Sequence, residues 1–251
     1  MDRWQNKVAV VTGASSGIGA ACVRYLLNNG MIVVGLARRL ERMDSMCSEL
    51  PEEQQKRFHT RRCDVSKEAD ILEAFAWIES KLGGVDVLIN NAGIAKLTAE
   101  LLKPNNSEDM KAVMDTNVMG VVYCTREAFQ SMKKRGFDGH VIIINSVAGH
   151  TIPIMHGMNI SMNIYPSSKH AVTAMTEVLR QEFLMNNTRI KITSISPGGT
   201  DTEMIPNKEL FPISFPLLSP EDIADAIIYC IQTPPSVQIH EMIIKPIGEM
   251  V

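Results

Sequence analysis

The chain has 251 residues, 45% of them hydrophobic, and a formal net charge of −3, so it suits one large α/β domain or two small ones and lacks the basic surface that binds nucleic acid. No apolar run is long enough to span a bilayer, and we expect neither a transmembrane segment nor a signal peptide. The five cysteines are scattered without metal-ligand spacing, which predicts reduced thiols, a cytoplasmic location and no metal site.

Short β-rich runs alternate with longer helical patterns along the chain. Strands are predicted at Lys7–Thr12, Met31–Ala37, Phe58–Asp64, Val85–Asn90, His140–Asn145, Lys191–Ser196 and Glu241–Lys245. Helices are predicted at about Gly17–Asn29, Arg39–Leu50, Lys67–Leu82, Ser107–Lys134, Tyr165–Met185 and Pro220–Thr233. Several strands are almost wholly apolar, as in a parallel sheet buried on both faces. The alternation predicts a single α/β domain over residues 1–251, a doubly wound parallel sheet of about seven strands flanked by helices.

The first strand runs into a glycine-rich turn, Thr12-Gly13-Ala14-Ser15-Ser16-Gly17-Ile18-Gly19. Gly13 permits a tight turn, Gly17 lets the backbone approach a phosphate, and Gly19 lets the helix pack close to the sheet. The helix N-terminus offers free N–H groups to a pyrophosphate, and the Ser15 and Ser16 hydroxyls can add donors. Because the turn follows an apolar strand and opens a helix, it predicts phosphate binding rather than a purely structural turn.

The second strand is followed by Ala37-Arg38-Arg39. A cofactor with a free ribose 2′-OH would favour a carboxylate here, whereas Arg can bind a 2′-phosphate through a bidentate fork. The sequence therefore predicts NADP rather than NAD, with Arg38 as the first candidate and Arg39 as the second. A solvated helix start is the alternative, and Glu41 nearby keeps it open.

The third and fourth strands also end in polar residues. Asp64-Val65 can place a carboxylate near an adenine amino group, although Asp64 would serve equally well as a cap for the helix that begins near Ser66. Asn90-Asn91-Ala92-Gly93 suits a crowded floor under a cofactor, and a plain turn would use the same residue types.

Four residues further on have the chemistry of a proton-transfer site. Asn117 lies within a predicted helix although Asn is a mediocre helix former. Ser146 follows the fifth strand, where its hydroxyl can orient a substrate oxygen. Tyr165 and Lys169 are one helical turn apart and so share a face, either as a solvated pair or as a functional one. A neighbouring ammonium favours the phenolate, so we expect a lowered Tyr165 pKa that suits general acid–base catalysis.

Together these motifs resemble the short-chain dehydrogenase/reductases over essentially the whole chain. The shared elements, in the family's order, are Thr12-Gly13-x-x-x-Gly17-x-Gly19, Asp64, Asn90-Asn91-Ala92-Gly93, Asn117, Ser146, Tyr165-x-x-x-Lys169 and Pro197-Gly198. The resemblance implies a Rossmann-type NADP-binding domain and hydride exchange between the nicotinamide C4 and a carbinol carbon. It implies that Tyr165 is the acid/base, that Lys169 also binds the nicotinamide ribose, and that Asn117 helps a local kink hold a water linking the lysine to solvent.

The same resemblance assigns a set of cofactor-binding residues. The expected set is Gly13, Ser15, Ser16, Gly17, Ile18, Gly19, Arg38, Arg39, Asp64, Val65, Asn91, Ala92, Gly93, Tyr165, Lys169, Pro197, Gly198, Thr200 and Thr202. The segment from Pro197 curves under the nicotinamide in related proteins, with the Thr200 backbone at the carboxamide and the Thr202 hydroxyl at a phosphate.

The spacing between Ser146 and Tyr165 departs from the family pattern. Ser146 precedes Tyr165 by 19 residues, whereas the family usually has about a dozen residues between them. Ser161 is closer in sequence, but we prefer Ser146 because a strand end is a fixed support. The extra residues form an insertion, 151–163, at the mouth of the site.

Two long irregular stretches are predicted to frame the substrate pocket, an active-site loop at 147–164 and a lid at 203–219. Their apolar residues are Ile152, Ile154, Met155, Met158, Ile160 and Met162 in the first and Met204, Ile205, Leu210, Phe211, Phe215 and Leu217 in the second. His150, His156 and Lys208 are the nearby cations or potential cations. A Met-rich apolar wall can adapt to flexible hydrocarbon, which predicts a lipophilic small-molecule substrate, although these residues could also simply tie the loops to the core.

The stretches Val34-Gly35-Leu36-Ala37-Arg38-Arg39 and Ile144-Asn145-Ser146-Val147-Ala148-Gly149-His150 resemble most a subgroup of insect NADP-dependent farnesol dehydrogenases and vertebrate SDR family member 11. That resemblance favours a farnesol-type isoprenoid alcohol, with hydroxysteroid dehydrogenase or general carbonyl reductase activity second. A catalytically silent NADP-binding module is disfavoured because the four proton-transfer residues are all present. By analogy, the helices around Asn117 and after Tyr165 would pair between subunits, giving a homodimer or homotetramer.

Overall fold

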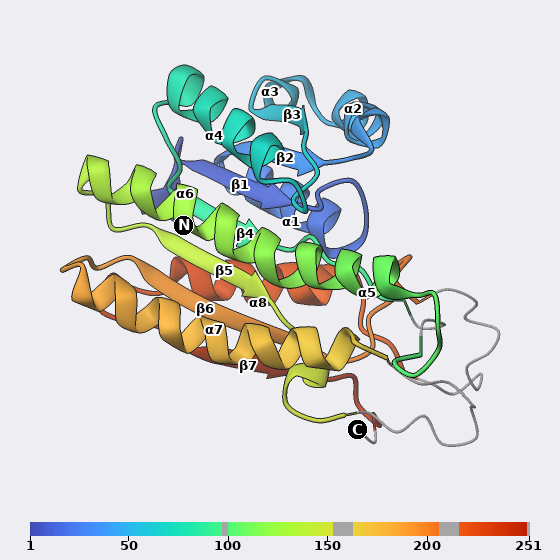
Figure 1. The fold of residues 1–251 in the computed structure, drawn as a ribbon. Coiled ribbons are helices and arrows are strands. Elements are labelled where there is room, and N and C mark those ends of the chain that lie inside the picture. Colours follow the sequence, from blue (N-terminus) through green and yellow to red (C-terminus); the bar gives the residue numbers. More distant parts are fainter. Residues whose placement is uncertain (97–99, 153–162, 206–215, 250–251) are drawn as a thin grey trace.

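The computed structural model describes residues 1–96, 100–152, 163–205 and 216–249. Within them, all seven strands lie in one parallel sheet in the order β3-β2-β1-β4-β5-β6-β7 (Figure 1). The strands are β1 (Val8–Thr12), β2 (Ile32–Ala37), β3 (Phe58–Arg62), β4 (Val87–Asn90), β5 (His140–Ile144), β6 (Lys191–Pro197) and β7 (Glu241–Ile244). Because β1 pairs with both β2 and β4, the strand order reverses beside β1, and such switch points are where open α/β sheets bind ligands.

Helices cover both faces of the sheet (Figure 1). They are α1 (Gly17–Asn28), α2 (Leu40–Glu49), α3 (Glu52–Gln55), α4 (Glu68–Leu82), α5 (Ser107–Met114), the π-helical segment η2 (Asp115–Met119), α6 (Gly120–Arg135), α7 (Tyr165–Met185) and α8 (Pro220–Gln232), with 3-10 turns η1 (Asp2–Trp4) and η3 (Val147–Gly149). One apolar cluster joins the sheet to α1, α2 and α8, and a second joins it to α4, α6 and α7. None of the described helices is long and apolar enough to cross a membrane.

The two clusters arise from the alternation of side chains along each strand. Ala9 and Val11 of β1 lie in the first cluster, whereas Val8 and Val10 lie in the second. Successive strand residues point to opposite faces, so an apolar residue at every position is needed when both faces are covered. The first cluster is closed at its edge by Trp4, whose Nε1 donates to the Ile231 carbonyl of α8 at 2.9 Å.

The predicted fold class and all seven predicted strands are confirmed, with the ends of the strands and main helices moved by two residues or fewer. One prediction was wrong in detail. The single helix expected at 107–134 is three consecutive segments, α5, η2 and α6, because the backbone takes a π-helical turn at Asp115–Met119. The short helix α3 and the two 3-10 turns were not predicted.

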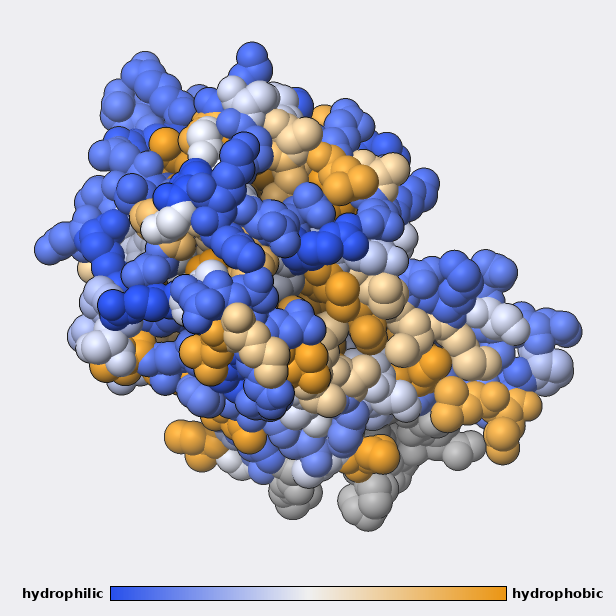
Figure 2. Space-filling view, turned by 60° about the vertical axis from the view of Figure 1, so that its left-hand side comes forward, coloured by the Kyte–Doolittle hydropathy of each residue, from blue (hydrophilic) through white to orange (hydrophobic). Residues whose placement is uncertain are grey.

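On the face shown in Figure 2, hydrophilic residues dominate the upper part and apolar residues become more frequent in the lower part. Large apolar side chains exposed on α7 are Val178, Leu184 and Met185.

Five described cysteines are free, and four of them are buried.

Candidate active site

The turn after β1 requires glycine at specific positions. Gly13 and Gly17 have φ values of +66° and +53°, a region that residues with a Cβ rarely adopt. A Cβ added at Gly13 would lie 2.9 Å from the Ala92 Cα, and one at Gly19 would lie 2.6 Å from Asn91 Nδ2 and closer still to the Gly13 carbonyl. Gly19 is therefore required by contact with the turn and the loop after β4, and not by helix-to-sheet packing as the sequence suggested.

The loop after β4 is tied to the same turn. Asn91 Nδ2 donates to the carbonyls of Thr12 at 2.9 Å and Gly13 at 3.3 Å, and Thr12 Oγ1 accepts from the backbone N–H groups of Asn91 and Ala92. The adjacent Asn90 points elsewhere and donates to Thr125 Oγ1 at 2.9 Å. Asn91 and Thr12 thus fix the floor of the groove at the switch point between β1 and β4.

The N-terminus of α1 fits an anionic group. Ser16 is its N-cap residue but makes no side-chain capping bond, so the first N–H groups of the helix are uncapped by it. They border a cavity of about 590 Å³ whose lining includes Ser16, Gly17, Arg24 and Thr202. Free N–H groups and the positive end of a helix dipole suit a phosphate.

The two arginines after β2 lie in different surroundings. Arg38 is exposed and makes no ion pair with any described residue. Arg39 reaches the glycine-rich turn, where Nη2 donates to Ser16 Oγ at 2.8 Å and to Ser15 Oγ at 3.3 Å. Its Nη1 binds Glu203 at 2.8 Å, a contact that the sequence did not reveal. Of the two predicted arginines, the second candidate is therefore the one that contacts the phosphate turn.

Asp64 and Val65 follow β3 beside α6. Asp64 Oδ1 accepts from the Ser66 backbone N–H at 3.1 Å and from its hydroxyl at 2.7 Å, which is the turn-capping role that the sequence left open. Val65 is buried, and a Cβ added at Gly120 would lie 2.9 Å from its carbonyl oxygen. The close approach of α6 fixes the position of this loop at the carboxyl end of β3.

Asn117 lies in the π-helical segment and joins three parts of the fold. Its Oδ1 accepts from the Ile94 N–H at 2.9 Å, and its Nδ2 donates to the Ile94 carbonyl at 3.0 Å and to Ser168 Oγ at 3.1 Å. Ser168 in turn donates to the Tyr165 carbonyl at 2.7 Å. The buried amide thus links the loop after β4 to the first turn of α7.

Ser146, Tyr165 and Lys169 come together at the carboxyl end of β5. The Ser146 side chain lies near the Tyr165 phenol and acts to lower the pKa of that phenol. Lys169 Nζ lies 5.7 Å from the centroid of the Tyr165 ring and donates to the Ile144 carbonyl at 2.9 Å. The pair expected from the sequence therefore faces a strand end and not solvent.

The expected lowering of the Tyr165 pKa is wrong. Burial raises the pKa of the phenol to about 12, and the hydrogen bond with Ser146 opposes that rise. Burial also lowers the pKa of Lys169 to about 8. Desolvation disfavours both charged forms, so it outweighs the attraction between ammonium and phenolate that the sequence suggested.

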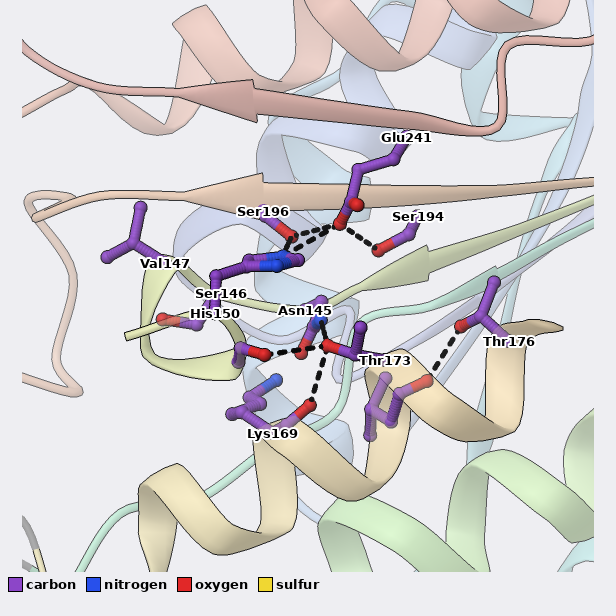
Figure 3. Close-up of polar contacts among 12 residues, drawn as sticks. Asn145, Ser146, Val147, His150, Lys169, Thr173, Thr176, Ser194, Ser196 and Glu241 are labelled. Atoms are coloured by element: carbon purple, nitrogen blue, oxygen red, sulfur yellow. Dashed lines mark hydrogen bonds and ion pairs between the residues drawn. The ribbon is translucent and has the colours of Figure 1, made fainter. Parts of the chain in front are cut away.

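The 3-10 turn that begins after Ser146 is held against α7 (Figure 3). Ser146 Oγ accepts from the Ala148 N–H at 3.1 Å. Thr173, one turn beyond Lys169, donates to the Gly149 carbonyl at 3.0 Å and accepts from Asn145 Nδ2 at 2.8 Å. These bonds fix the Ser146 backbone relative to the helix that carries the tyrosine and lysine.

On its other side, this turn is held by His150. Its Nε2 lies 2.8 Å from Glu241 Oε1 on β7 and 3.1 Å from Ser196 Oγ on β6 (Figure 3). Glu241 also accepts from Ser196 at 3.0 Å and Ser194 at 3.3 Å. His150 was expected near the substrate pocket, but its ring points to this network. No local sequence signal could have paired it with Glu241.

The segment after β6 is fixed at several points. Gly198 N donates to the Ile244 carbonyl at 2.7 Å, and Gly199 N donates to Glu249 Oε2 at 2.9 Å. Thr200 forms a parallel bridge with Leu218. Thr202 lies against the phosphate turn, because a Cβ at Gly17 would be 3.0 Å from its Cγ2. Pro197, Gly198, Thr200 and Thr202 are therefore at the same end of the sheet as Tyr165.

Much of the predicted substrate pocket lies outside the described residues. This holds for Ile154, Met155, His156, Met158, Ile160, Ser161, Met162, Lys208, Leu210, Phe211 and Phe215. Among the described pocket candidates, Ile152 and Met204 are exposed. The described part of the chain contains no group of three or more His, Cys, Asp or Glu that could hold a metal ion.

Comparisons with known proteins agree with this geometry. Residues 7–211 match the family model described as short chain dehydrogenase. A farnesol dehydrogenase of Aedes aegypti is 54% identical over 249 residues, which cover 99% of both chains. Dehydrogenase/reductase SDR family member 11 of Mus musculus is 40% identical over 256 residues, 98% of this chain and 96% of that one.

Solved structures are similar over nearly the whole chain. An alcohol dehydrogenase from the archaeon Thermococcus sibiricus, complexed with 5-hydroxy-NADP, has a TM-score of 0.82 and 27% identity, covering 97% of both chains. The closed form of a serine dehydrogenase complexed with NADP⁺ has a TM-score of 0.83 and 28% identity, covering 97% of this chain and 96% of that one.

Proposed function

Because the chain belongs to the short-chain dehydrogenase family, we propose that this oxidoreductase is NADP-dependent and interconverts a lipophilic alcohol and its carbonyl compound by hydride transfer. The observation that carries the proposal is the meeting of Ser146, Tyr165 and Lys169 at the end of β5. A hydroxyl, a phenol and an ammonium at one point are what proton transfer to and from an alcohol oxygen requires.

In the oxidative direction, the Ser146 hydroxyl donates to the substrate oxygen and the Tyr165 phenolate takes the carbinol proton; reduction runs the same transfers in reverse. NADP, held by the residues named below, would supply the hydride chemistry of this reaction. Lys169 Nζ donates one N–H to the Ile144 carbonyl, which leaves two N–H groups that would bind the nicotinamide ribose hydroxyls. The cationic nicotinamide and ribose contacts would favour the phenolate, offsetting the desolvation found without them. Asn117 would hold the water between Lys169 and solvent.

The residues around the switch point fit NADP. The uncapped N-terminus of α1, with Ser15, Ser16, Gly17, Ile18 and Gly19, would hold the pyrophosphate. Arg38 and Arg39 would bind the 2′-phosphate. The remaining expected contacts are Asp64 and Val65 at the adenine, Gly13, Asn91, Ala92 and Gly93 along the floor, and Pro197, Gly198, Thr200 and Thr202 at the nicotinamide and its phosphate. NADP in two similar structures supports this choice.

We propose a farnesol-type isoprenoid alcohol as substrate, supported by the name of the Aedes aegypti relative and by the apolar composition of segments 147–164 and 203–219. Hydroxysteroid dehydrogenase or general carbonyl reductase activity is the second candidate, supported by the similarity to SDR family member 11. The two segments act as active-site loop and lid in this proposal.

Two further expectations remain proposals. The free cysteines support a reducing compartment such as the cytoplasm. The apolar side chains exposed on α7 support association through that helix as a homodimer or homotetramer. Light scattering of the purified protein would measure the assembly directly.

Replacement of the Tyr165 hydroxyl tests the assignment. Tyr165→Phe should keep the Kd for NADPH within about twofold and reduce kcat at least ~100-fold, because only the proton donor is lost. The rates are measured by NADPH absorbance with farnesol, a hydroxysteroid and a small charged alcohol. Tyr229→Phe is the matched control, since Tyr229 is an exposed tyrosine on α8.

Undiminished turnover by Tyr165→Phe would exclude the proposed acid/base. Faster turnover of the small charged alcohol than of farnesol by the unmodified protein would exclude the lipophilic substrate class while leaving the proton machinery intact.

A further inference from the structure

The residues Thr202–Met204, called here the strap, lie across the groove where a cofactor would bind. Thr202 contacts the phosphate turn at Gly17, and Met204 reaches the loop after β4, where its Cε would be 3.7 Å from a Cβ on Gly93. Between them, Glu203 reaches Arg39 after β2 and Arg42 in the first turn of α2. One short segment therefore touches all three loops that form the groove.

The contact made by Glu203 uses both oxygens of its carboxylate. Oε2 binds Arg39 Nη1 at 2.8 Å, and Oε1 binds Arg42 Nη1 at 2.5 Å. The same Arg39 holds the hydroxyls of Ser15 and Ser16 through Nη2. The Glu203 carboxylate thus accepts from two guanidinium groups, one of which also holds the phosphate turn.

The Glu203 carboxylate is charged at neutral pH, but its ion pairs with Arg39 and Arg42 are exposed to solvent. Its hydrogen bonds with Arg39 and then Arg42 lower the pKa of Glu203 below its ordinary value. The side chains are 40% exposed for Arg39, 44% for Arg42 and 54% for Glu203. Ion pairs that exposed contribute little to stability, so a more highly charged anion with matching geometry can replace the carboxylate.

We propose that Glu203 is a specificity-determining residue whose carboxylate competes with a 2′-phosphate for Arg39, one of the two arginines proposed to bind that phosphate. The inference rests on the proposed use of NADP. A 2′-phosphate must displace Glu203 or be repelled by it, whereas a ribose 2′-OH carries no charge and leaves the ion pairs in place. Glu203 therefore weakens the binding of a 2′-phosphorylated nucleotide selectively, and 2′-phosphate binding releases the strap.

Calorimetric titration with two nucleotides tests this competition. Adenosine 2′,5′-bisphosphate carries the 2′-phosphate and AMP lacks it. In Glu203→Gln the Kd for the bisphosphate should fall by roughly fivefold, as expected for one exposed charge interaction, and the Kd for AMP should stay within about twofold. Glu203→Asp keeps the charge and should bind the bisphosphate like the unmodified protein.

Glu221→Gln is the matched control. Glu221 lines the same cavity but forms no ion pair with an arginine among the described residues, so its replacement should leave both Kd values unchanged. An unchanged or raised bisphosphate Kd in Glu203→Gln overturns the inference, while a preference of the unmodified protein for the bisphosphate over AMP still supports NADP. Equal binding of the two nucleotides by both the unmodified protein and Glu203→Gln overturns both proposals.

Discussion

Tyr165 and Lys169 are both buried, and burial moves each toward its neutral form. A phenol with a pKa near 12 is a poor base at neutral pH, so proton transfer requires groups that stabilise the phenolate. Among the described residues, the hydrogen bond from Ser146 is the contact that lowers the phenol's pKa. Ser146 therefore has two proposed tasks at residue scale, orientation of the substrate oxygen and stabilisation of the phenolate.

Ser146→Ala should separate these tasks. Loss of a donor to the reacting oxygen should reduce kcat by about 10²–10³-fold. Loss of the bond that lowers the Tyr165 pKa should move the alkaline rise of the oxidation rate to higher pH. The measurement is kcat against pH with NADP⁺ and the best alcohol. Ser194→Ala is the control, because the Ser194 hydroxyl binds only Glu241 in the described structure. An unshifted pH profile in Ser146→Ala would contradict its role in stabilising the phenolate.

At the scale of elements, the π-helical segment η2 places a buried amide between two loops of the site. A π turn changes the hydrogen-bonding register of a helix, and such segments are frequent at functional sites. Asn117 uses this position to pair with both backbone groups of Ile94 and with Ser168. The loop after β4 and the first turn of α7 are thereby held together by a single side chain.

Asn117→Ala should loosen that junction. It leaves the two half-buried backbone groups of Ile94 without their partner, which should lower the free energy of unfolding by about 1–3 kcal/mol and reduce kcat as well. Urea unfolding and steady-state rates measure the two effects. Asn186→Ala removes bonds near the exposed end of α7 and should change neither by much. Unfolding free energies that match in the two variants would argue against the junction.

Features that depend on residues close together in the sequence could be predicted, whereas features that depend on residues far apart could not. The strands could be read from apolar runs such as Val141–Ile144, because burial on both faces requires them. The phosphate turn and the Tyr165 and Lys169 pair are local patterns. The π turn has no compositional signal that distinguishes it from α-helix. The bond between Arg39 and Glu203 spans 164 positions, and the burial that raises the Tyr165 pKa depends on the folded surroundings, so neither could be predicted.

At the scale of the whole molecule, burial of the central strands constrains the few titratable groups within them. His140 on β5 is fully buried. Its Nε2 donates to Thr193 Oγ1 at 2.9 Å, because the Thr193 hydroxyl is itself used as donor to the Ile239 carbonyl. The Nδ1 atom has no partner in the described structure. Burial, with Lys191 and Arg3 adding repulsion, lowers the pKa of His140 to about 3, so the ring stays neutral.

His140 should therefore contribute to acid unfolding. As the pH falls below 6.5, the His140 imidazole becomes protonated in the unfolded chain. In the folded chain the same imidazole stays neutral until about pH 3. Stability is lost through this window as the pH falls, at up to ~1.4 kcal/mol per pH unit. Relative to pH 7.5, the loss at pH 4.5 in urea unfolding should be roughly 2–3 kcal/mol smaller in His140→Gln. The exposed His170→Gln should keep the original loss, and an equal loss in all three proteins would exclude His140 as its source.

The packing of α1 against α8 also bears on how the chain is made. The two helices share one apolar cluster, and Trp4 is bonded to the end of α8. Synthesis runs from the N-terminus, so the apolar face of α1 stays uncovered until α8 leaves the ribosome. The intervening chain takes roughly 10–40 s to translate at ~5–20 residues per second. For that time the growing polypeptide presents an apolar surface that its own last helix will cover, and chaperones have a defined site to shield.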